Sequence, residues 1–356
     1  MKKRHYIGKG IFALLVVAAT LAGCSKDSDT NDNPTPPEVQ DPYKGWPTQP
    51  KIKEGETSYI SFYTQREVGE AFIFNLYGNG WIDLNNNGVQ DPDEKTELFM
   101  GDKKISPLPS QVFTIYGKIN TLNAFDCRLK GLDVSHTSNL EDLRVDINSL
   151  TELNLKENRG LTYLSAYENK LPQLDLKENK DLTYLNLSKN AIEQLDLTEN
   201  KALTYLDIAE NAIRQLNLAE NKALTNLYAA KNAFQQLDLT KNEALTDLEV
   251  SNNQLTALDL RANTQLTWVD LSGNKLSEEA MLKTVESLPQ REEASQGKIV
   301  LQTFRIVEGK QEVENNKPNE ETLKKLGAKK WKAQFINKEG KPKEYNGKLN
   351  APHEKP

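Results

Sequence analysis

The chain has 356 residues, of which 37% are hydrophobic and 27% are charged, and its formal net charge is −6 at pH 7. A mean hydropathy of −0.66 excludes a polytopic membrane protein, and the acidic balance argues against a general nucleic-acid binder, which needs a basic face for phosphates. Two cysteines and three histidines exclude a disulfide framework and leave little for a zinc site or a catalytic triad.

Residues 1–23 have the pattern of a bacterial export signal. A basic start, Lys2 to Arg4, precedes an apolar stretch from Ile11 to Leu21 that is too short to span a bilayer. The sequence Leu21-Ala22-Gly23-Cys24 resembles the lipobox of bacterial lipoproteins, which implies cleavage before Cys24 and lipidation of its thiol. The alternative is an ordinary secretory signal with an incidental cysteine.

Residues 24–50 are expected to form a disordered tether because polar residues and prolines cannot bury enough apolar surface to fold. Asp27 and Asp29, just behind Cys24, resemble the export signal of Bacteroidota lipoproteins. The resemblance implies an outer membrane lipoprotein exposed at the cell surface, with the membrane contacted through the lipid anchor only. Anchoring in the inner leaflet is the alternative.

Residues 51–118 alternate apolar and polar side chains in short runs, at 59–62, 71–76 and 112–116, which predicts β-strands. A repeat array follows this segment, and the first unit of an array exposes apolar surface unless something covers it. We therefore expect residues 51–118 to form an N-terminal β cap.

Within this segment, residues 83–94 match the calcium-loop pattern D-x-N-x-N-G-x5-E. Hard oxygen donors in a tight loop suit Ca²⁺, so the sequence predicts a structural calcium site without a sensor role, because no helices flank the loop. The alternative is a polar hairpin loop in which Asn and Asp bond their own backbone. The predicted ligands are Asp83, Asn85, Asn87, the Val89 carbonyl, Asp91 and Glu94.

Residues 119–286 repeat with a period of 21. Asparagine recurs in the ninth place of each repeat, from Asn148 to Asn274, and Cys127 takes that place in the first. A lone thiol in such a column is expected to be a buried structural residue rather than a redox or lipid site. The first apolar column is Ile119, Leu140, Leu161, Leu182, Leu203, Leu224, Leu245 and Leu266, and the second is Leu122, Leu143, Leu164, Leu185, Leu206, Leu227, Leu248 and Val269.

This LxxLxLxxN/CxL pattern is that of leucine-rich repeats, in which stacked units bury one continuous leucine core. It predicts a mainly β solenoid of about eight 21-residue coils, with extended chain rather than long helices on the convex side. The repeats resemble internalin-like leucine-rich repeats, especially the 21-residue kind of Bacteroidota surface lipoproteins. That resemblance implies a recognition or adhesion module.

Residues 287–356 are expected to form a C-terminal α/β cap and a basic tail. A helix should start at Ser277 and end at Pro289, followed by a strand at 299–301, a helix at 321–326 and a strand at 331–336. The lysines of the tail are expected to be solvated rather than to bind an anionic ligand.

Alternation along each short strand turns the third, fifth and seventh places of a coil toward the concave surface. Tyrosines in neighbouring coils should then form an exposed ladder, with acidic residues farther along the same face. The alternative is that the tyrosines pack across strands only to stiffen the sheet. The predicted ligand-binding residues are Tyr163, Tyr167, Tyr184, Tyr205, Tyr228, Trp268, Asp207, Glu249 and Asp270.

The sequence contains no nucleophile–base pair, metal-ligand cluster or phosphate loop, so an enzyme is not expected. The favoured function is a surface-anchored protein-recognition or adhesion module that uses the concave face, as the internalin resemblance implies. The alternative is a glycan-capturing lipoprotein that stacks sugar rings on the tyrosine ladder.

Overall fold

The computed structural model describes residues 43–307, 310–313, 316, 318–337 and 341–344. The predicted signal peptide, Cys24 and most of the tether lie outside these residues, as does the end of the basic tail. No helix in the described part of the chain is both long and apolar enough to cross a membrane.

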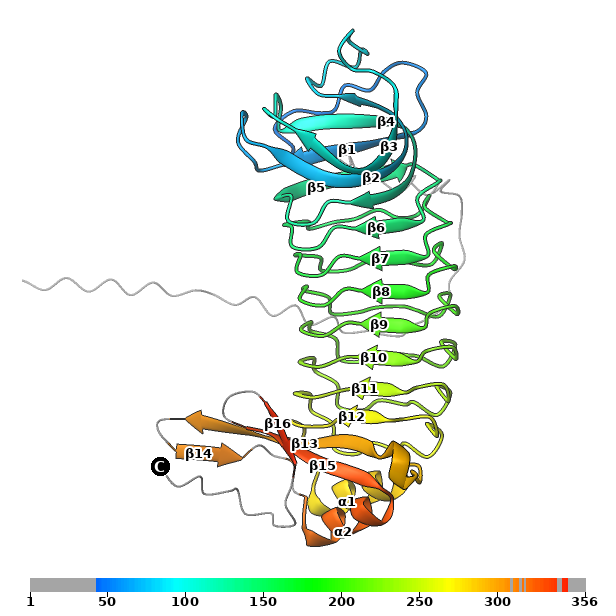
Figure 1. Ribbon diagram of the computed structural model, residues 1–356, viewed down its shortest axis with the longest axis vertical. Coiled ribbons are helices and arrows are strands. Elements are labelled where there is room, and N and C mark those ends of the chain that lie inside the picture. The colour runs from blue at the N-terminus through cyan, green and yellow to red at the C-terminus, as the bar shows by residue number, and fades with distance from the viewer. Residues whose placement is uncertain (1–42, 308–309, 314–315, 317, 338–340, 345–356) are drawn as a thin grey trace, which may run out of the picture. The chain divides into compact units, whose positions relative to one another are not determined.

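The N-terminal part is a strongly bent antiparallel sheet (Figure 1). Its strands pair in the order β5-β1-β4-β2-β3, and the three runs predicted as strands lie in β1, β2 and β4. Aromatic residues fill its interior, with the rings of Phe62 and Phe113 stacked 4.8 Å apart. The strands are β1 (Tyr59–Thr64), β2 (Phe72–Asp83), β3 (Glu97–Ile105), β4 (Val112–Asn123) and β5 (Leu129–His136).

The boundary expected between residues 118 and 119 falls inside β4. The end of this strand pairs in parallel with the first short strand of the coils, with Leu122 opposite Leu143. The first of the eight expected coils is therefore shared with the N-terminal sheet. The predicted register is nevertheless kept, because Leu122 fills the first position of the second leucine column.

Seven coils follow, and each contributes a three-residue strand to one parallel sheet (Figure 1). Leucines of the second column lie opposite one another, as Leu164 does to Leu185. The rest of each described coil is turn and extended chain, which confirms the predicted β solenoid. The strands are β6 (Asp142–Arg144), β7 (Tyr163–Ser165), β8 (Tyr184–Asn186), β9 (Tyr205–Asp207), β10 (Asn226–Tyr228), β11 (Asp247–Glu249) and β12 (Trp268–Asp270).

The ninth-place asparagines join each coil to the one before it. Asn253, which is 6% exposed, donates from Nδ2 to the carbonyls of Ala229, Val250 and Ser251 at 2.9, 3.1 and 3.2 Å. Its Oδ1 accepts from the amide of Phe234 at 3.1 Å. Backbone groups that would otherwise be buried without partners are thereby satisfied.

Cys127 occupies the same column in the first coil. It is fully buried, its Sγ donates to the Ile73 carbonyl at 3.1 Å, and burial raises the pKa of its thiol to about 12. The thiolate is therefore disfavoured at neutral pH, and the structural interpretation of this residue is confirmed.

Beyond β12 the parallel sheet gains two more strands, β13 (Gly297–Val307) and β15 (Trp331–Ile336), as predicted. The predicted helices are α1 (Glu278–Ser287), capped by the Ser277 side chain, and α2 (Glu320–Ala328). One continuous hydrophobic core runs from the N-terminal sheet through the leucine columns to Trp331, and a smaller cluster of Tyr59, Trp81 and Tyr116 is separate from it. The remaining elements are the short helix η1 (Glu293–Ser295), β14 (Lys310–Val313) and β16 (Pro342–Glu344).

Candidate functional site

Three tyrosines in the third place of consecutive coils form a stacked ladder on β7, β8 and β9. The rings of Tyr163 and Tyr184 are 4.1 Å apart and inclined by 4°, and those of Tyr184 and Tyr205 are 4.3 Å apart and inclined by 9°. Their side chains are half-buried, and burial raises the pKa of Tyr163 to about 12. The structure thus contains the predicted ladder, which leaves ring edges rather than ring faces for a partner.

Arg144 closes the N-terminal end of this ladder. Its guanidinium lies 4.2 Å from the centroid of the Tyr163 ring. The same group donates two hydrogen bonds to the Asp142 carboxylate, Nε to Oδ1 at 2.9 Å and Nη2 to Oδ2 at 2.8 Å. An aromatic ring face and a carboxylate therefore hold a guanidinium on this surface, the arrangement that its planar, delocalised charge favours.

The aromatic row changes direction beyond Tyr205. Tyr228 comes from the fifth place, and its ring is 5.4 Å from Tyr205 and tilted by 45°. Trp268 returns to the third place, 6.4 Å from Tyr228 and tilted by 43°. These rings are too far apart and too inclined to cover one another's faces as the first three do.

Carboxylates lie between these tilted rings. Asp207 and Glu249 are the register neighbours of Tyr228 on either side in the fifth-place column, and Asp247 is the neighbour of Trp268. Burial raises the pKa of Asp207 and of Glu249, and repulsion from Asp207 adds to the effect on Glu249. The C-terminal half of the face therefore mixes aromatic and acidic side chains, whereas the sequence predicted an aromatic half followed by an acidic half.

Asp270 and Tyr167 differ from the sequence-based expectation. Asp270 is only 7% exposed, and its carboxylate accepts from the amide and the hydroxyl of Ser272 at 2.9 and 2.7 Å. It therefore serves the turn that ends its coil, because a turn amide needs an acceptor that the short strand cannot supply. Asp207 accepts the amide of Ala209 at 3.0 Å in the same way but stays half-buried, so burial is what closes Asp270 to a ligand.

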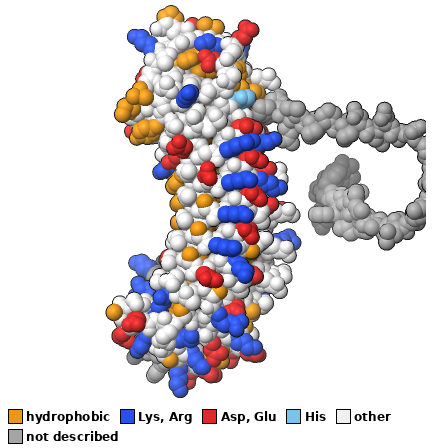
Figure 2. Space-filling view, turned by 90° about the vertical axis from the view of Figure 1, so that its right-hand side faces the viewer, with side chains coloured by type: hydrophobic (Ala, Val, Ile, Leu, Met, Phe, Trp, Pro, Cys, Tyr) orange, Lys and Arg blue, Asp and Glu red, His pale blue; other side chains and the backbone are white. Residues whose placement is uncertain are grey.

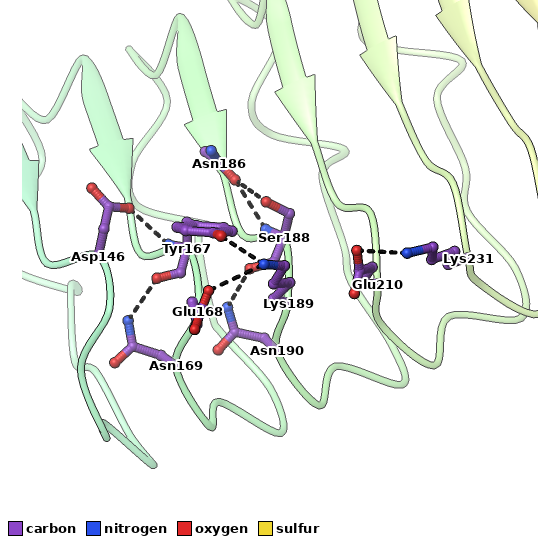
Figure 3. A network of polar contacts seen from close by, with 10 residues as sticks. All are labelled: Asp146, Tyr167, Glu168, Asn169, Asn186, Ser188, Lys189, Asn190, Glu210 and Lys231. Carbon is purple, nitrogen blue, oxygen red and sulfur yellow. Dashed lines mark hydrogen bonds and ion pairs between the residues drawn. The ribbon is translucent and has the colours of Figure 1, made fainter. Parts of the chain in front are cut away.

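Tyr167 lies after the end of β7, and its side chain points toward Lys189 of the next coil (Figure 3). Its hydroxyl accepts from Lys189 Nζ at 2.7 Å, and the same ammonium lies 3.2 Å from Glu168 Oε2. The ammonium is also 4.9 Å from the centre of the Tyr167 ring. The seventh place has already left the strand, so its side chain joins the turns of neighbouring coils instead of the aromatic row.

The Asp/Asn-rich loop at 83–94 is held by its own hydrogen bonds. The Asp83 carboxylate accepts from the amides of Asn87 and Gly88 at 3.1 and 2.8 Å, and Glu94 accepts from the amides of Leu84 and Asp91 at 2.8 and 3.0 Å. Burial raises the pKa of both carboxyl groups. Among the described residues, no group of three or more His, Cys, Asp or Glu side chains is placed to hold a metal. Calcium in this loop stays a prediction.

An exposed apolar patch on the N-terminal sheet was not predicted from the sequence. Tyr77 on β2 lies opposite Thr121 of β4 and Met100 of β3, so the patch continues the concave face beyond the first coil. The feature of the sequence that could have indicated this patch is the alternation along β2 and β3, which leaves apolar residues on both faces of the strands. Figure 2 shows hydrophobic side chains gathered at the left edge of this sheet; the exposed members are Ile73, Tyr77, Leu98, Met100 and Phe125.

One flank of the coils carries regular bands of basic and acidic side chains (Figure 2). Three of its cations pair with a glutamate of the next coil: Arg159 with Glu178 at 3.6 Å, Lys180 with Glu199 at 3.2 Å, and Lys201 with Glu220 at 3.3 Å. Exposed pairs of this kind contribute little stability, but they neutralise the flank. The flank is therefore a weaker candidate for charge-based recognition than the concave face.

No protein-family model matches the chain, and no curated protein matches it either. Similar solved structures include the functional domain of InlJ from Listeria monocytogenes, with 27% identity and a TM-score of 0.40 over 55% of this chain and 51% of that one. A leucine-rich-repeat protein of Leptospira interrogans has 26% identity and a TM-score of 0.43 over 45% and 44%. Internalin C2 of Listeria monocytogenes has 24% identity and a TM-score of 0.36 over 43% and 80%.

The chain thus spans about half the length of the first two of these structures. Its own geometry, parallel strands β6 to β12 stacked at a 21-residue spacing, is that of a leucine-rich-repeat solenoid.

Proposed function

We propose that the chain is a non-enzymatic recognition module whose concave face binds a protein partner. The observation that carries the proposal is the half-exposed aromatic row from Tyr163 to Trp268 with carboxylates beside it. Tyr and Trp bring large contact area at a small entropic cost, which is why they are enriched at binding interfaces.

The stacking favours a protein over a glycan as the ligand. Sugar rings stack on open aromatic faces, whereas Tyr163, Tyr184 and Tyr205 cover one another's faces and Arg144 covers the end of the row. Ring edges and hydroxyls remain, and these contact peptide groups and side chains well. Glycan capture is the alternative outcome of the experiment below.

Replacing Tyr163, Tyr184 and Tyr205 together by alanine should weaken partner binding at least tenfold, because the central aromatic contact is removed. The measurement is retention of host surface proteins and of a polysaccharide panel on immobilised protein. The matched control replaces the same three residues by phenylalanine, which keeps the stacked rings. Far-UV circular dichroism checks that both variants fold.

If the alanine variant retains every ligand as well as the wild type does, the concave face is not the binding surface. If the alanine variant loses only its binding to polysaccharides, the ligand of the concave face is a glycan rather than a protein.

Attachment to the cell surface through Cys24 is part of the same proposal, and it is supported by the lipobox-like sequence. We expect a Cys24→Ser variant to appear in the soluble fraction, while recovery in the membrane fraction would contradict the anchor. Adhesion then follows as the use of a surface-held binding face.

The loop at 83–94 is proposed to bind a structural Ca²⁺, supported by the spacing of its oxygen-bearing residues. A cation bound only by the folded state must raise stability. The melting temperature should therefore be higher in millimolar calcium than in chelator, and an Asp83→Asn variant should lose most of this difference. Equal melting temperatures of the wild type in calcium and in chelator would contradict the proposed calcium site.

A further inference from the structure

Aromatic and acidic side chains are interspersed on β9 to β12. The third and fifth places read Tyr and Asp on β9, Asn and Tyr on β10, Asp and Glu on β11, and Trp and Asp on β12. The pairing register sets these strands side by side, so each tilted ring has a carboxylate in a neighbouring coil. Neighbouring strands are about 4.8 Å apart, which brings ring and carboxylate within reach of one cationic group.

The other end of the same face shows which group such a surface accepts. There the guanidinium of Arg144 stacks on Tyr163 and forms a two-pronged contact with Asp142. Both interactions come from third-place residues on adjacent strands, β6 and β7. The chain thus supplies its own arginine to an aromatic ring and a carboxylate at the N-terminal end of the row.

At the C-terminal end, no Lys or Arg of the described residues stacks on Tyr228 or Trp268 as Arg144 does on Tyr163. Among the described residues, no Lys or Arg forms a hydrogen bond or ion pair with Asp207, Asp247 or Glu249. The ammonium of Lys231 pairs with Glu210 at 2.9 Å (Figure 3), and its charge partly offsets the rise that burial causes in the pKa of Glu249. Lys298 is the register neighbour of Trp268 on β13. Burial nevertheless raises the pKa of Asp207 and of Glu249, so an incoming cation would offset the cost of ionising these two groups.

We infer that the C-terminal half of the concave face, around Tyr228 and Trp268 with Asp207, Asp247 and Glu249, binds the guanidinium groups of arginine side chains on a protein partner. The inference rests on the proposed function, because it specifies the chemistry of the partner at the same face. It commits the site to an arginine-bearing polypeptide.

Guanidinium fits this surface better than the other cations that carboxylates attract. It is planar, stacks on an aromatic face and presents paired donors to a carboxylate at the same time. An ammonium is a compact, strongly hydrated charge without a stacking face. A metal ion needs several oxygens converging on one point, whereas register here places a tyrosine between Asp207 and Glu249.

The experiment uses a fluorescent octa-arginine peptide as the probe and follows its anisotropy with the mature protein at low and at physiological salt. The test variant combines Asp207→Asn with Glu249→Gln, which keeps shape and hydrogen-bond acceptors but removes two charges. The matched control combines Asp196→Asn with Asp238→Asn, two exposed carboxylates in the second half of their coils. Both variants change the net charge by the same amount.

The wild type and the control should bind the peptide alike, and the test variant should bind it at least tenfold more weakly. An octa-lysine peptide should bind the wild type more weakly than octa-arginine. Raised pKa values mean that the neutral forms of Asp207 and Glu249 are favoured in the folded state, so the test variant should melt no lower than the wild type. Lost binding would then not reflect unfolding.

Absence of octa-arginine binding to the wild type, or equal weakening in the test and control variants, would overturn the inference. Equal affinity for octa-arginine and octa-lysine would reduce it to a general electrostatic attraction and would also count against it. The alanine and phenylalanine variants of the tyrosine ladder decide the proposed function separately. If a protein partner no longer binds the alanine variant of the ladder but still binds the variant with Asp207→Asn and Glu249→Gln, the proposed function stands and only the arginine inference fails.

Discussion

Replacing Asn253 by alanine is expected to lower the free energy of unfolding by about 3 to 5 kcal/mol. The side-chain amide of this residue makes four buried hydrogen bonds, two with Ala229 and Phe234 of the preceding coil and two within its own coil. Each buried backbone group left without a partner costs about 1 to 3 kcal/mol, and alanine supplies no replacement. Urea unfolding should show a lower midpoint with an unchanged slope.

The matched control is Asn217→Ala. Asn217 is exposed and accepts a single hydrogen bond, from the amide of Ala219 at 3.1 Å. Water can take over that bond, so the loss should stay below about 1 kcal/mol. Similar losses in the two variants would mean that the ninth-place column does not hold the coils together.

Replacing Gly80 by alanine is expected to prevent the N-terminal sheet from forming, with a loss of at least about 4 kcal/mol. A Cβ at this position would lie 1.7 Å from the carbonyl oxygen of Tyr116 and 2.8 Å from its carbon. Both atoms are backbone in the paired strand β4, so they cannot turn away as a flexible side chain could. Thermal unfolding and limited proteolysis should show an opened N-terminal part.

Loss of the N-terminal sheet should also destabilise the coils, because Leu122 of β4 lies opposite Leu143, the first leucine pair of the solenoid. Gly160→Ala is the control, since nothing lies within 4 Å of a Cβ placed there. Its effect should stay within about 1 kcal/mol. A Gly80→Ala protein that melts like the wild type would contradict the close approach of β2 and β4.

The sequence predicted the solenoid well because its period and its core have the same physical origin. One coil buries its leucines only against the next, so Leu143, Leu164 and Leu185 must recur at a fixed interval and their register follows. The cap at Ser277 and the helix after it were also predictable, because the start of a helix depends on residues three or four positions apart. Local patterns of this kind need no knowledge of distant chain segments.

The boundary between the N-terminal sheet and the coils was less predictable. Strand β4 pairs with β1 and β2 on the N-terminal side and with β6 on the other, so no break in the chain marks the change. The patch around Met100 depends on the same pairing, since β3 reaches the concave face only by lying next to β2. Pairings of distant strands leave little trace in local periodicity.

Within the candidate site, the sequence by itself determined which residues leave the strands toward the concave side, because alternation is a property of the extended backbone. Only the tertiary structure decided what each of them does there. In the folded chain Tyr163 stacks on Tyr184, Tyr228 tilts away from Tyr205, and Asp270 is buried against its turn. Side chains from different coils compete for the same space, and the stacking of the rings is settled between residues one coil apart in the chain. Asp270 bonds Ser272 only two positions away, but its burial depends on the packing of the neighbouring strands.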